Sequence, residues 1–286
     1  MKIEKFLSFI CFLILMTCSS NDDSSSPDPD PDPVNQCDAG FCIKVATYNV
    51  AVGKKATPLA IATRLQPLNL DVLTLTECPT LIDPNSPDKD FIEIIAEKLE
   101  MPYWEIGTIS SSDHWEAWGT DISGKYHGKL KAILSKTPLS NSEDIALNGS
   151  GWSPASTLKA TTTIESKTIT IYALHIPGSN DTVTGSVHKD LADRIIANET
   201  SSNFIVTGDF NDIPSNATMS YINDKGMSNA LDDLDNLADR IDDYTPGRID
   251  NILYNTNSNA KGIDGFSTYV SSLSDHPYVW VRLLYK

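Results

Sequence analysis

The 286-residue sequence predicts an α/β domain, because strand-like and helix-like segments follow one another along the chain. Short apolar segments with few polar positions are typical of strands buried between layers. Segments with apolar residues every three to four positions are typical of amphipathic helices. Hydrophobic residues make up 40% of the chain, as in a soluble globular protein with a substantial core. No repeat of 20–50 residues is evident, so we expect one domain over residues 37–286.

The N-terminal half of this domain is expected to contain three strands and two helices. Two nearly apolar strands at 44–50 and 70–76 enclose a helix at 58–68. The helix at 88–99 has the clearest pattern, because its apolar residues recur at i, i+4 and i+8 and acidic residues stand at its start. A shorter strand is expected at 103–108.

A long segment without clear periodicity follows at residues 109–129. A loop of this length inside a compact domain is usually functional, for example as a lid. Its residues Trp115 and Trp118 fit a partly buried position better than a substrate contact.

The C-terminal half begins with a strand at 130–136. Residues 157–164 and 168–175 flank a polar turn and are expected to form a hairpin. A helix is expected at 186–199, and the final strand at 277–285 alternates aliphatic residues with bulkier or charged ones.

The N-terminus predicts export. A basic start, an apolar run and an exit of small residues over 1–17 indicate a signal peptide. The residues before Cys18 resemble a bacterial lipobox, although Thr17 stands where Gly, Ala or Ser is usual. We therefore expect lipidation of Cys18 and anchoring at the bacterial cell envelope, on the outer membrane or cell surface. A plain signal peptide is the alternative. Residues 18–36 are rich in Ser, Pro and Asp and are expected to form a solvated tether of about 20–25 Å.

The charge of the chain bears on its partners. The whole chain carries −16, and residues 1–17 carry +1, so the processed chain carries −17. Five aspartates of the tether leave −12 for the folded part. A protein that neutralises nucleic-acid phosphates needs a basic face. The sequence has no basic run, so nucleic acid is not favoured as a partner. No obligate protein partner is evident, and we expect a monomer.

The cysteines predict one cross-link. Cys37 and Cys42 lie just before the first strand and can close a small disulfide loop in an exported protein. Neither has further Cys or His residues at zinc spacing. Cys78 has no obvious partner and is expected to be packed in the core.

Polar residues whose side chains can bind a metal or act in catalysis follow several of the apolar strands. The clearest case is the segment Phe204-Ile205-Val206-Thr207-Gly208-Asp209-Phe210-Asn211, in which a glycine turn presents a carboxylate and a carboxamide. The C-terminal ends of strands are where α/β proteins usually place their sites. Other polar residues also stand at the end or the start of a predicted strand: Asn49, Glu77, His175, Asp250, Asp275 and His276.

In this order, the motifs resemble those of the endonuclease/exonuclease/phosphatase family of metal-dependent phosphoesterases. The resemblance covers roughly residues 43–286 and includes Tyr48-Asn49-Val50, Thr76-Glu77, Leu174-His175, Gly208-Asp209-Phe210-Asn211, Arg248-Ile249-Asp250 and Ser274-Asp275-His276. It implies a four-layer α/β sandwich, in which two mixed β-sheets pack face to face with helices outside.

A hard cation such as Mg²⁺ prefers carboxylate and amide oxygens. Glu77 at a strand end is the best candidate ligand, with Asn49 beside it and Asp275 opposite, and the resemblance implies the same metal set. Mn²⁺ and Ca²⁺ are alternatives, whereas the absence of a Cys/His cluster argues against a soft metal.

The resemblance also implies the catalytic residues. Asp209 and Asn211 match the pair that positions or deprotonates the attacking water and holds the phosphate. His276 matches the histidine on the scissile phosphate, Asp250 the carboxylate that orients it, and His175 a second active-site histidine. Residue identity leaves open whether Asp209 or His276 takes the proton from water.

The sequence departs from the family at several positions around the expected site. Lys131 replaces an asparagine that precedes the Ala-Ile-Leu-Ser strand in many members, and Ile176-Pro177 follow His175 where leucine is usual. Some nucleases place a further acid or tyrosine in the middle loop, and Tyr126 is the candidate here.

These observations predict a Mg²⁺-dependent phosphoester hydrolase, tethered to the envelope, in which water attacks a phosphodiester. Its substrate is left open among nucleic acid, phospholipid headgroup and small phosphorylated molecules. The alternative is a surface lipoprotein that keeps the fold for binding without catalysis.

Overall fold

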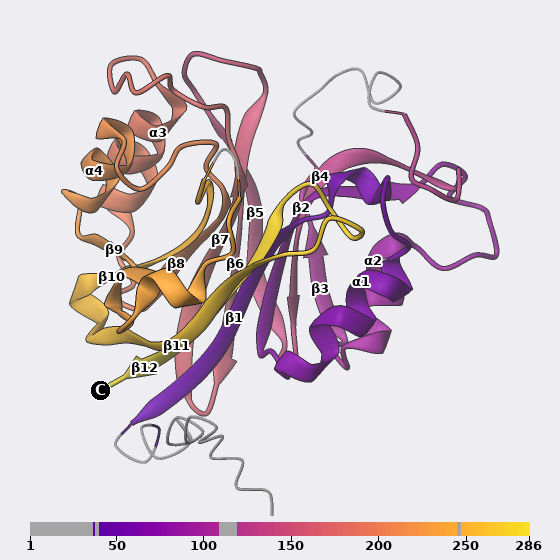
Figure 1. The fold of residues 1–286 in the computed structure, drawn as a ribbon, viewed down its shortest axis with the longest axis horizontal. Helices are drawn as coiled ribbons and strands as arrows, with labels where there is room; N and C mark the ends of the chain where they lie inside the picture. Colours follow the sequence, from indigo (N-terminus) through magenta and orange to yellow (C-terminus); the bar gives the residue numbers. More distant parts are fainter. Residues whose placement is uncertain (1–36, 38–39, 109–118, 245–246) are drawn as a thin grey trace, which may run out of the picture. The chain divides into compact units, whose positions relative to one another are not determined.

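The computed structural model describes residue 37 and residues 40–108, 119–244 and 247–286. These residues belong to one compact unit. The predicted signal peptide, Cys18 and the tether lie outside the described residues, as do Trp115 and Trp118. Within the described part, two six-stranded mixed sheets pack face to face with helices on their outer sides (Figure 1). The four-layer sandwich expected from the resemblance is therefore confirmed.

The first sheet has the strand order β11-β12-β1-β2-β4-β3. Strands β1 and β2 are parallel, with Asn49 opposite Thr76, so Asn49 and Glu77 reach the same end of the sheet. The strands are β1 (Phe41–Asn49), β2 (Val72–Leu81), β3 (Tyr103–Ile106), β4 (Tyr126–Ser135), β11 (Ala260–Tyr269) and β12 (Pro277–Tyr285).

The second sheet has the order β5-β6-β7-β8-β10-β9. Strands β7 and β8 end beside the start of the antiparallel strand β10, because His175 pairs with Asp209 across β7 and β8, and Asp209 pairs with Asp250 across β8 and β10. The strands are β5 (Leu139–Leu147), β6 (Ala155–Ile164), β7 (Lys167–His175), β8 (Phe204–Asp209), β9 (Met227–Asn229) and β10 (Asp250–Asn255).

Helices cover the outer face of each sheet (Figure 1). The first sheet is covered by α1 (Pro58–Leu65) and α2 (Phe91–Lys98), and the second by α3 (Val187–Asp190) and α4 (Ala217–Asn223). Helix α3 continues through a π turn and a 3₁₀ turn to Asn198. A separate apolar core, which includes Ile133, Ile171 and Val281, fills the space between the sheets.

Helix α2 shows why the clearest sequence pattern was reliable. The side chain of Asp90 accepts from the backbone of the first turn, and the backbone N–H of Asp90 donates to the carboxylate of Glu93. This capping box satisfies N–H groups that would otherwise be unpaired. Phe91 and Ile95 are buried on the stripe that the spacing predicts.

Among the strands and α-helices of the described residues, four were not predicted: β5, β9, β11 and α4. Strand β5 is an edge strand with the polar sequence LSNSEDIAL and a largely exposed surface, so it lacks the apolar pattern of a buried strand. Strand β2 begins at Val72 and continues to Leu81, past the predicted end at residue 76.

The cysteines behave as their positions indicated. Cys37 and Cys42 are joined by a disulfide with Cα atoms 5.7 Å apart, and Cys78 is fully buried in the core on the helical side of the first sheet. No helix of the described residues is both long enough and apolar enough to cross a membrane.

Candidate active site

The site is built first from the turn after β8. Gly208 has φ +138°, and a Cβ atom there would lie 2.0 Å from the carbonyl oxygen of Leu174 on β7, so only glycine allows this approach. The close approach brings Asp209 beside His175. After the strand, Asn211 takes a left-handed conformation (φ 52°), and its backbone N–H donates to Asp209 Oδ1 at 2.9 Å.

The first sheet contributes Asn49 and Glu77. Glu77 lies in an irregularity of β2, between Leu75 and Cys78, where the register with β4 shifts, and its φ is +50°. A bulge of this kind re-aims one side chain out of the regular alternation. The carboxylate of Glu77 accepts an ion-pair hydrogen bond of 2.6 Å from Lys129 on β4.

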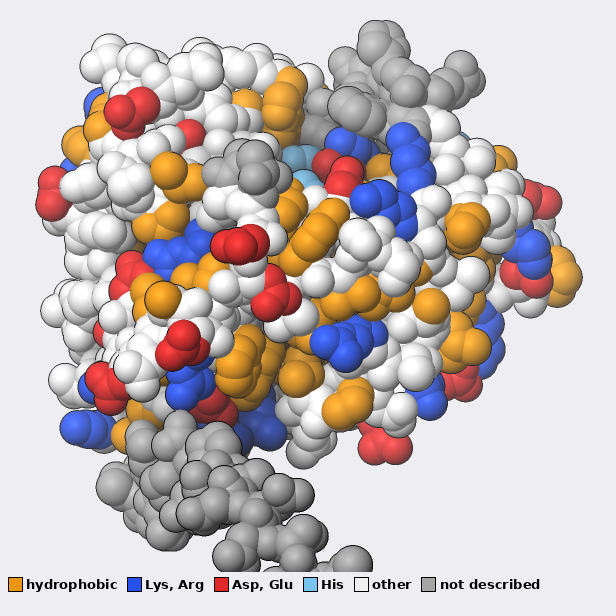
Figure 2. All heavy atoms as spheres, viewed as in Figure 1, with side chains coloured by type: hydrophobic (Ala, Val, Ile, Leu, Met, Phe, Trp, Pro, Cys, Tyr) orange, Lys and Arg blue, Asp and Glu red, His pale blue; other side chains and the backbone are white. Residues whose placement is uncertain are grey.

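The two sheets meet through these polar groups. The Asn49 amide donates to Asp209 Oδ2 at 3.0 Å and lies 3.4 Å from His276 Nε2. His175 Nε2 is 3.6 Å from Asp209 Oδ2 and 3.8 Å from Glu77 Oε1. Glu77, Asp209 and His276 therefore converge although the sequence separates them widely. Figure 2 shows histidine side chains in a hollow, next to acidic and basic side chains.

The loop before β12 holds His276 in place. Ser274 Oγ donates to the carbonyl of Asn49 at 2.6 Å and accepts from the backbone N–H of His276 at 3.2 Å. The other ring nitrogen of His276, Nδ1, lies 2.8 Å from Asp250 Oδ2. This contact orients the ring and leaves Nε2 facing the Asn49 amide, as in other carboxylate–histidine pairs.

The electrostatics of the cluster favour a cationic His276. Burial alone would lower its pKa, but the hydrogen bond and charge of Asp250, with the charge of Asp209, raise the pKa of His276 to about 9. Burial, and then the charge of Asp250, raise the pKa of Asp209 to about 8. Burial raises the pKa of Asp250 as well, against the hydrogen bond from His276. The site thus holds an imidazolium against buried carboxyl groups.

His175 has the opposite character. Burial, followed by the positive charges of Lys129 and Lys131, lowers its pKa well below the usual range. Its ring is also packed against the edge of Trp152, with centroids 4.9 Å apart. A neutral imidazole that touches Glu77 and Asp209 can donate or accept one hydrogen bond without adding charge.

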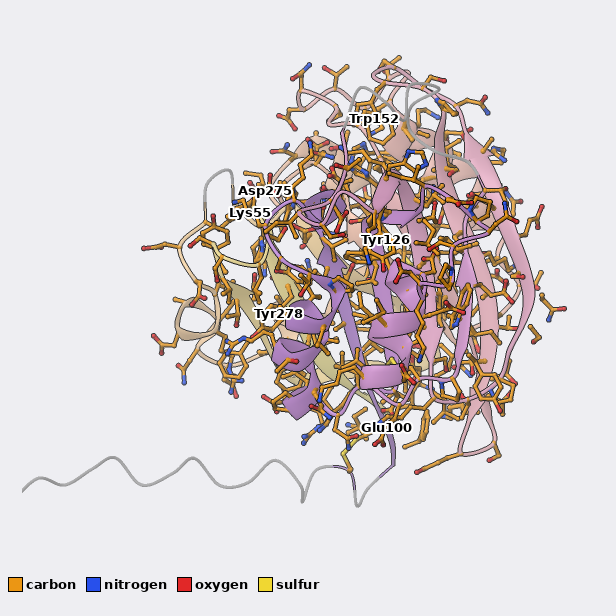
Figure 3. All side chains as sticks on the ribbon, turned by 90° about the vertical axis from the view of Figure 1, so that its right-hand side faces the viewer. Lys55, Glu100, Tyr126, Trp152, Asp275 and Tyr278 are labelled. Carbon is orange, nitrogen blue, oxygen red and sulfur yellow. A yellow bond between two sulfur atoms is a disulfide. The ribbon has the colours of Figure 1, made fainter. Side chains whose placement is uncertain are left out.

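Two other residues of the expected set occupy the margin. Asp275 is exposed and lies at the same end of the sandwich as Lys55, opposite to the end where Glu100 lies (Figure 3). Its charge contributes to the raised pKa of His276. The side-chain amide of Asn211 donates to the carbonyl of Ile176 at 2.9 Å, so it holds the loop after β7.

Tyr126 does not belong to the site, and its prediction as a middle-loop active-site residue was wrong. The side chain is 4% exposed, its hydroxyl donates to the carbonyl of Lys89 at 2.7 Å, and its ring packs edge-on against Phe91. It begins β4 and serves the core beneath α2, because the strand starts four residues earlier than the pattern indicated.

The comparisons with known proteins agree with this geometry. The model of the endonuclease/exonuclease/phosphatase family matches residues 46–276, most of the chain. The chain belongs to the endonuclease/exonuclease/phosphatase family. Members of the family are metal-dependent phosphoesterases, so the protein is an enzyme that hydrolyses phosphoric esters. A comparison with curated protein sequences found no match.

Solved structures share the fold of this family member at low sequence identity. The endonuclease/exonuclease/phosphatase from Beutenbergia cavernae is 17% identical, with a TM-score of 0.64 over 85% of this chain and 72% of that one. The human Nocturnin catalytic domain with bound sulfate is 15% identical, with a TM-score of 0.60 over 86% and 94%. A mannosyl-6-phosphatase from Bacteroides thetaiotaomicron is 16% identical, with a TM-score of 0.58 over 85% and 100%.

The donor set fits the divalent metal that the family uses. Asp209, Asp250 and His276 have potential ligand atoms within 4.8 Å of one another, and of these the carboxylate oxygens are the ones open to a cation, because His276 Nδ1 lies against Asp250 Oδ2. Asp250 Oδ1 is buried without a hydrogen-bond partner among the described residues. Glu77 and Asn49 add oxygens on the facing sheet. A set dominated by carboxylate and amide oxygens suits a hard cation.

Sequence reasoning missed three residues that border this site. Lys129 contacts Glu77, Trp152 contacts His175, and the ring of Tyr244 lies 5.9 Å from that of His276. Lys129 was missed because it falls at the end of the segment 109–129, for which no strand was predicted, whereas β4 begins at Tyr126. The two aromatic residues lie on loops, where nothing in the sequence ties them to the site.

Proposed function

We propose that this enzyme hydrolyses a phosphodiester by direct attack of water, with Mg²⁺ as its metal. The observation that carries the proposal is the Asn49 amide, which lies within hydrogen-bonding distance of both Asp209 and His276 and so ties the two sheets into one polar centre. Phosphoryl transfer depends mainly on positioning and on compensation of charge, and this centre supplies groups for both.

In the proposed mechanism, Asp209 and Asp250 of the second sheet act with His276, which precedes β12 of the first sheet, on the proton and the phosphate charge. Asp209, in its carboxylate form, orients the attacking water and accepts its proton. The imidazolium of His276 donates through Nε2 to a phosphoryl oxygen while Asp250 holds Nδ1. The hydrogen bond from the Asn49 amide holds the Asp209 carboxylate in position beside the phosphate.

Glu77, Asn49 and Asp275 are the residues proposed to hold the metal, with Mn²⁺ and Ca²⁺ as alternatives to Mg²⁺. When bound, the cation offsets the negative charge of the phosphoryl oxygens. Magnesium is proposed because the ligands are few and hard, and Mg²⁺ usually keeps several waters.

The acidity of the chain favours a substrate other than long nucleic acid. The net charge of −16 opposes a polyanion over most of the surface. A phospholipid headgroup or a small phosphorylated molecule suits such a surface better. The mannosyl-6-phosphatase among the structural neighbours has this fold and is named for a small sugar phosphate.

A substrate panel tests the proposal. Plasmid DNA, RNA, sphingomyelin and bis-p-nitrophenyl phosphate would each be incubated with the enzyme in Mg²⁺ or in EDTA. We expect hydrolysis of at least one diester in Mg²⁺ and none in EDTA. Hydrolysis that is undiminished by EDTA would exclude the metal-dependent mechanism, and the absence of hydrolysis throughout would exclude the proposed phosphodiester activity.

Two variants then test the residue roles on whichever substrate is cleaved. His276→Ala should lower kcat by at least about 100-fold, the usual cost of one electrostatic or proton-transfer group. Glu77→Gln should raise the Mg²⁺ concentration needed for half-maximal activity. Lys189→Ala, on the exposed face of α3, is the control that should retain parental kinetics. Parental values in both site variants would refute the assignment.

A further inference from the structure

Strand β4 directs two lysines into the end of the space between the sheets. The side chains of Lys129 and Lys131 are 8% and 4% exposed. Lys131 lies 3.9 Å from Asp144 on β5 of the facing sheet. A buried ammonium is costly unless a carboxylate or another acceptor compensates it. A buried lysine at these positions must therefore be compensated, and Lys129 is compensated by its ion-pair partner.

That partner is Glu77, whose carboxylate is the proposed ligand for the divalent cation. Lys129 Nζ lies 2.6 Å from Glu77 Oε1, and His175 Nε2 lies 3.8 Å from the same oxygen. A bound Mg²⁺ ion would be held by the same carboxylate. An ammonium and a divalent cation on one carboxylate repel each other strongly in a partly buried site. We therefore expect the ammonium and the cation to compete for Glu77 Oε1.

We propose that Lys129 and the divalent cation exchange on Glu77, and that the displaced ammonium binds the phosphoryl group of the substrate. This inference rests on the proposed function, because it takes Glu77 as a cation ligand. The exchange couples the binding of the cation to the binding of the phosphoryl group. The cation alone displaces a buried ion pair and leaves Lys129 without its carboxylate, whereas an anion that arrives with the cation gives the ammonium a new partner.

Calorimetric titration of the full-length protein with Mg²⁺, in the absence and presence of inorganic phosphate, measures this coupling. We expect phosphate to tighten Mg²⁺ binding by about 5-fold or more in the parent, the lower range of typical coupling between sites. In Lys129→Met, Mg²⁺ alone should bind about 5-fold or more tightly than in the parent, and phosphate should tighten Mg²⁺ binding less than it does in the parent, because only the direct attraction between cation and phosphate remains. Lys129→Arg should retain coupling.

Matched variants separate the outcomes. Lys159→Met removes another lysine that is paired with a glutamate, on β6 and outside the site, and should leave Mg²⁺ affinity unchanged. Near-UV circular dichroism establishes that each variant is folded, and Lys129→Gln replaces Lys129→Met if the latter is not. Unchanged Mg²⁺ affinity in the folded Lys129→Met or Lys129→Gln protein, or no phosphate coupling in the parent, would overturn the exchange.

The Glu77→Gln variant distinguishes failure of this inference from failure of the proposed function. If Glu77→Gln weakens Mg²⁺ binding while the Lys129 variants match the parent, the cation site stands and only the exchange is excluded. If Glu77→Gln binds Mg²⁺ like the parent, Glu77 is not a ligand, and the proposed metal site and the exchange fail together.

Discussion

At the scale of single residues, the charged groups around each histidine of the site determine its protonation state. The two active-site histidines share a residue type, yet their pKa values move in opposite directions. His276 faces Asp250 and Asp209, which raise its pKa to about 9, whereas burial and two lysines lower the pKa of His175. One ring is thus suited to carry charge and the other to remain neutral.

This difference predicts the alkaline side of the pH profile. Because the folded-state pKa of His276 is about 9, its cation persists below that pH, and kcat/KM should fall as pH rises through about 9. Asp250→Asn removes the charge that raises this pKa, so the descending limb should move towards the ordinary histidine value of about 6.5. The measurement is kcat/KM from pH 5 to 10, with Asp232→Asn at the surface as control. An unshifted limb in Asp250→Asn would assign the limb to another group.

At the scale of elements, the site depends on places where strands depart from regularity. Glu77 leaves the alternation of β2 at a register shift, and Asp209 reaches His175 because Gly208 lets β8 approach β7 closely. Regular strands would direct these carboxylates elsewhere. The irregularities are therefore part of how the two sheets present their polar groups to each other.

Gly208→Ala tests the close approach. The new Cβ would lie 2.0 Å from the Leu174 carbonyl oxygen, which requires the two strands to separate, so unfolding free energy should fall by about 3 kcal/mol or more. Gly185→Ala is the matched control, because Gly185 also has a positive φ (75°) but no atom lies within 4 Å of the added Cβ. It should cost only about 1–2 kcal/mol. Urea unfolding measures both, and equal losses would show that backbone conformation alone matters at Gly208.

At the scale of the whole molecule, the chain combines an acidic surface with an N-terminus that predicts export. We propose that Cys18 carries an acyl anchor and that the enzyme acts at the bacterial cell envelope. The proposal rests on the signal-like residues 1–17 and on the Ser, Pro and Asp composition of residues 18–36. An enzyme held in this way would meet substrates outside the cytoplasm, in keeping with the Cys37–Cys42 disulfide.

Cys18→Ser tests the anchor. A multiply acylated cysteine binds membranes stably, so its loss should release the protein from the membrane fraction or halt its processing. Fractionation followed by immunoblotting measures both. Ser19→Ala, one residue further along, should fractionate like the parent. If the Cys18→Ser protein is processed and remains equally membrane-bound, the anchor lies elsewhere.

The sequence by itself determined the fold class, helix α2, the family and the set of candidate site residues, because periodicity and short motifs depend only on residues that are close together in the chain. Asn49, Glu77, Asp209 and His276 were all named from strand ends. Strands β5 and β11 were not predicted, because both are edge strands with polar sequences that lack the apolar pattern of a buried strand. Tertiary structure alone decided that Tyr126 is a core residue and that Lys129 pairs with Glu77. Those contacts join residues far apart in the chain, so only packing of the two sheets determines them.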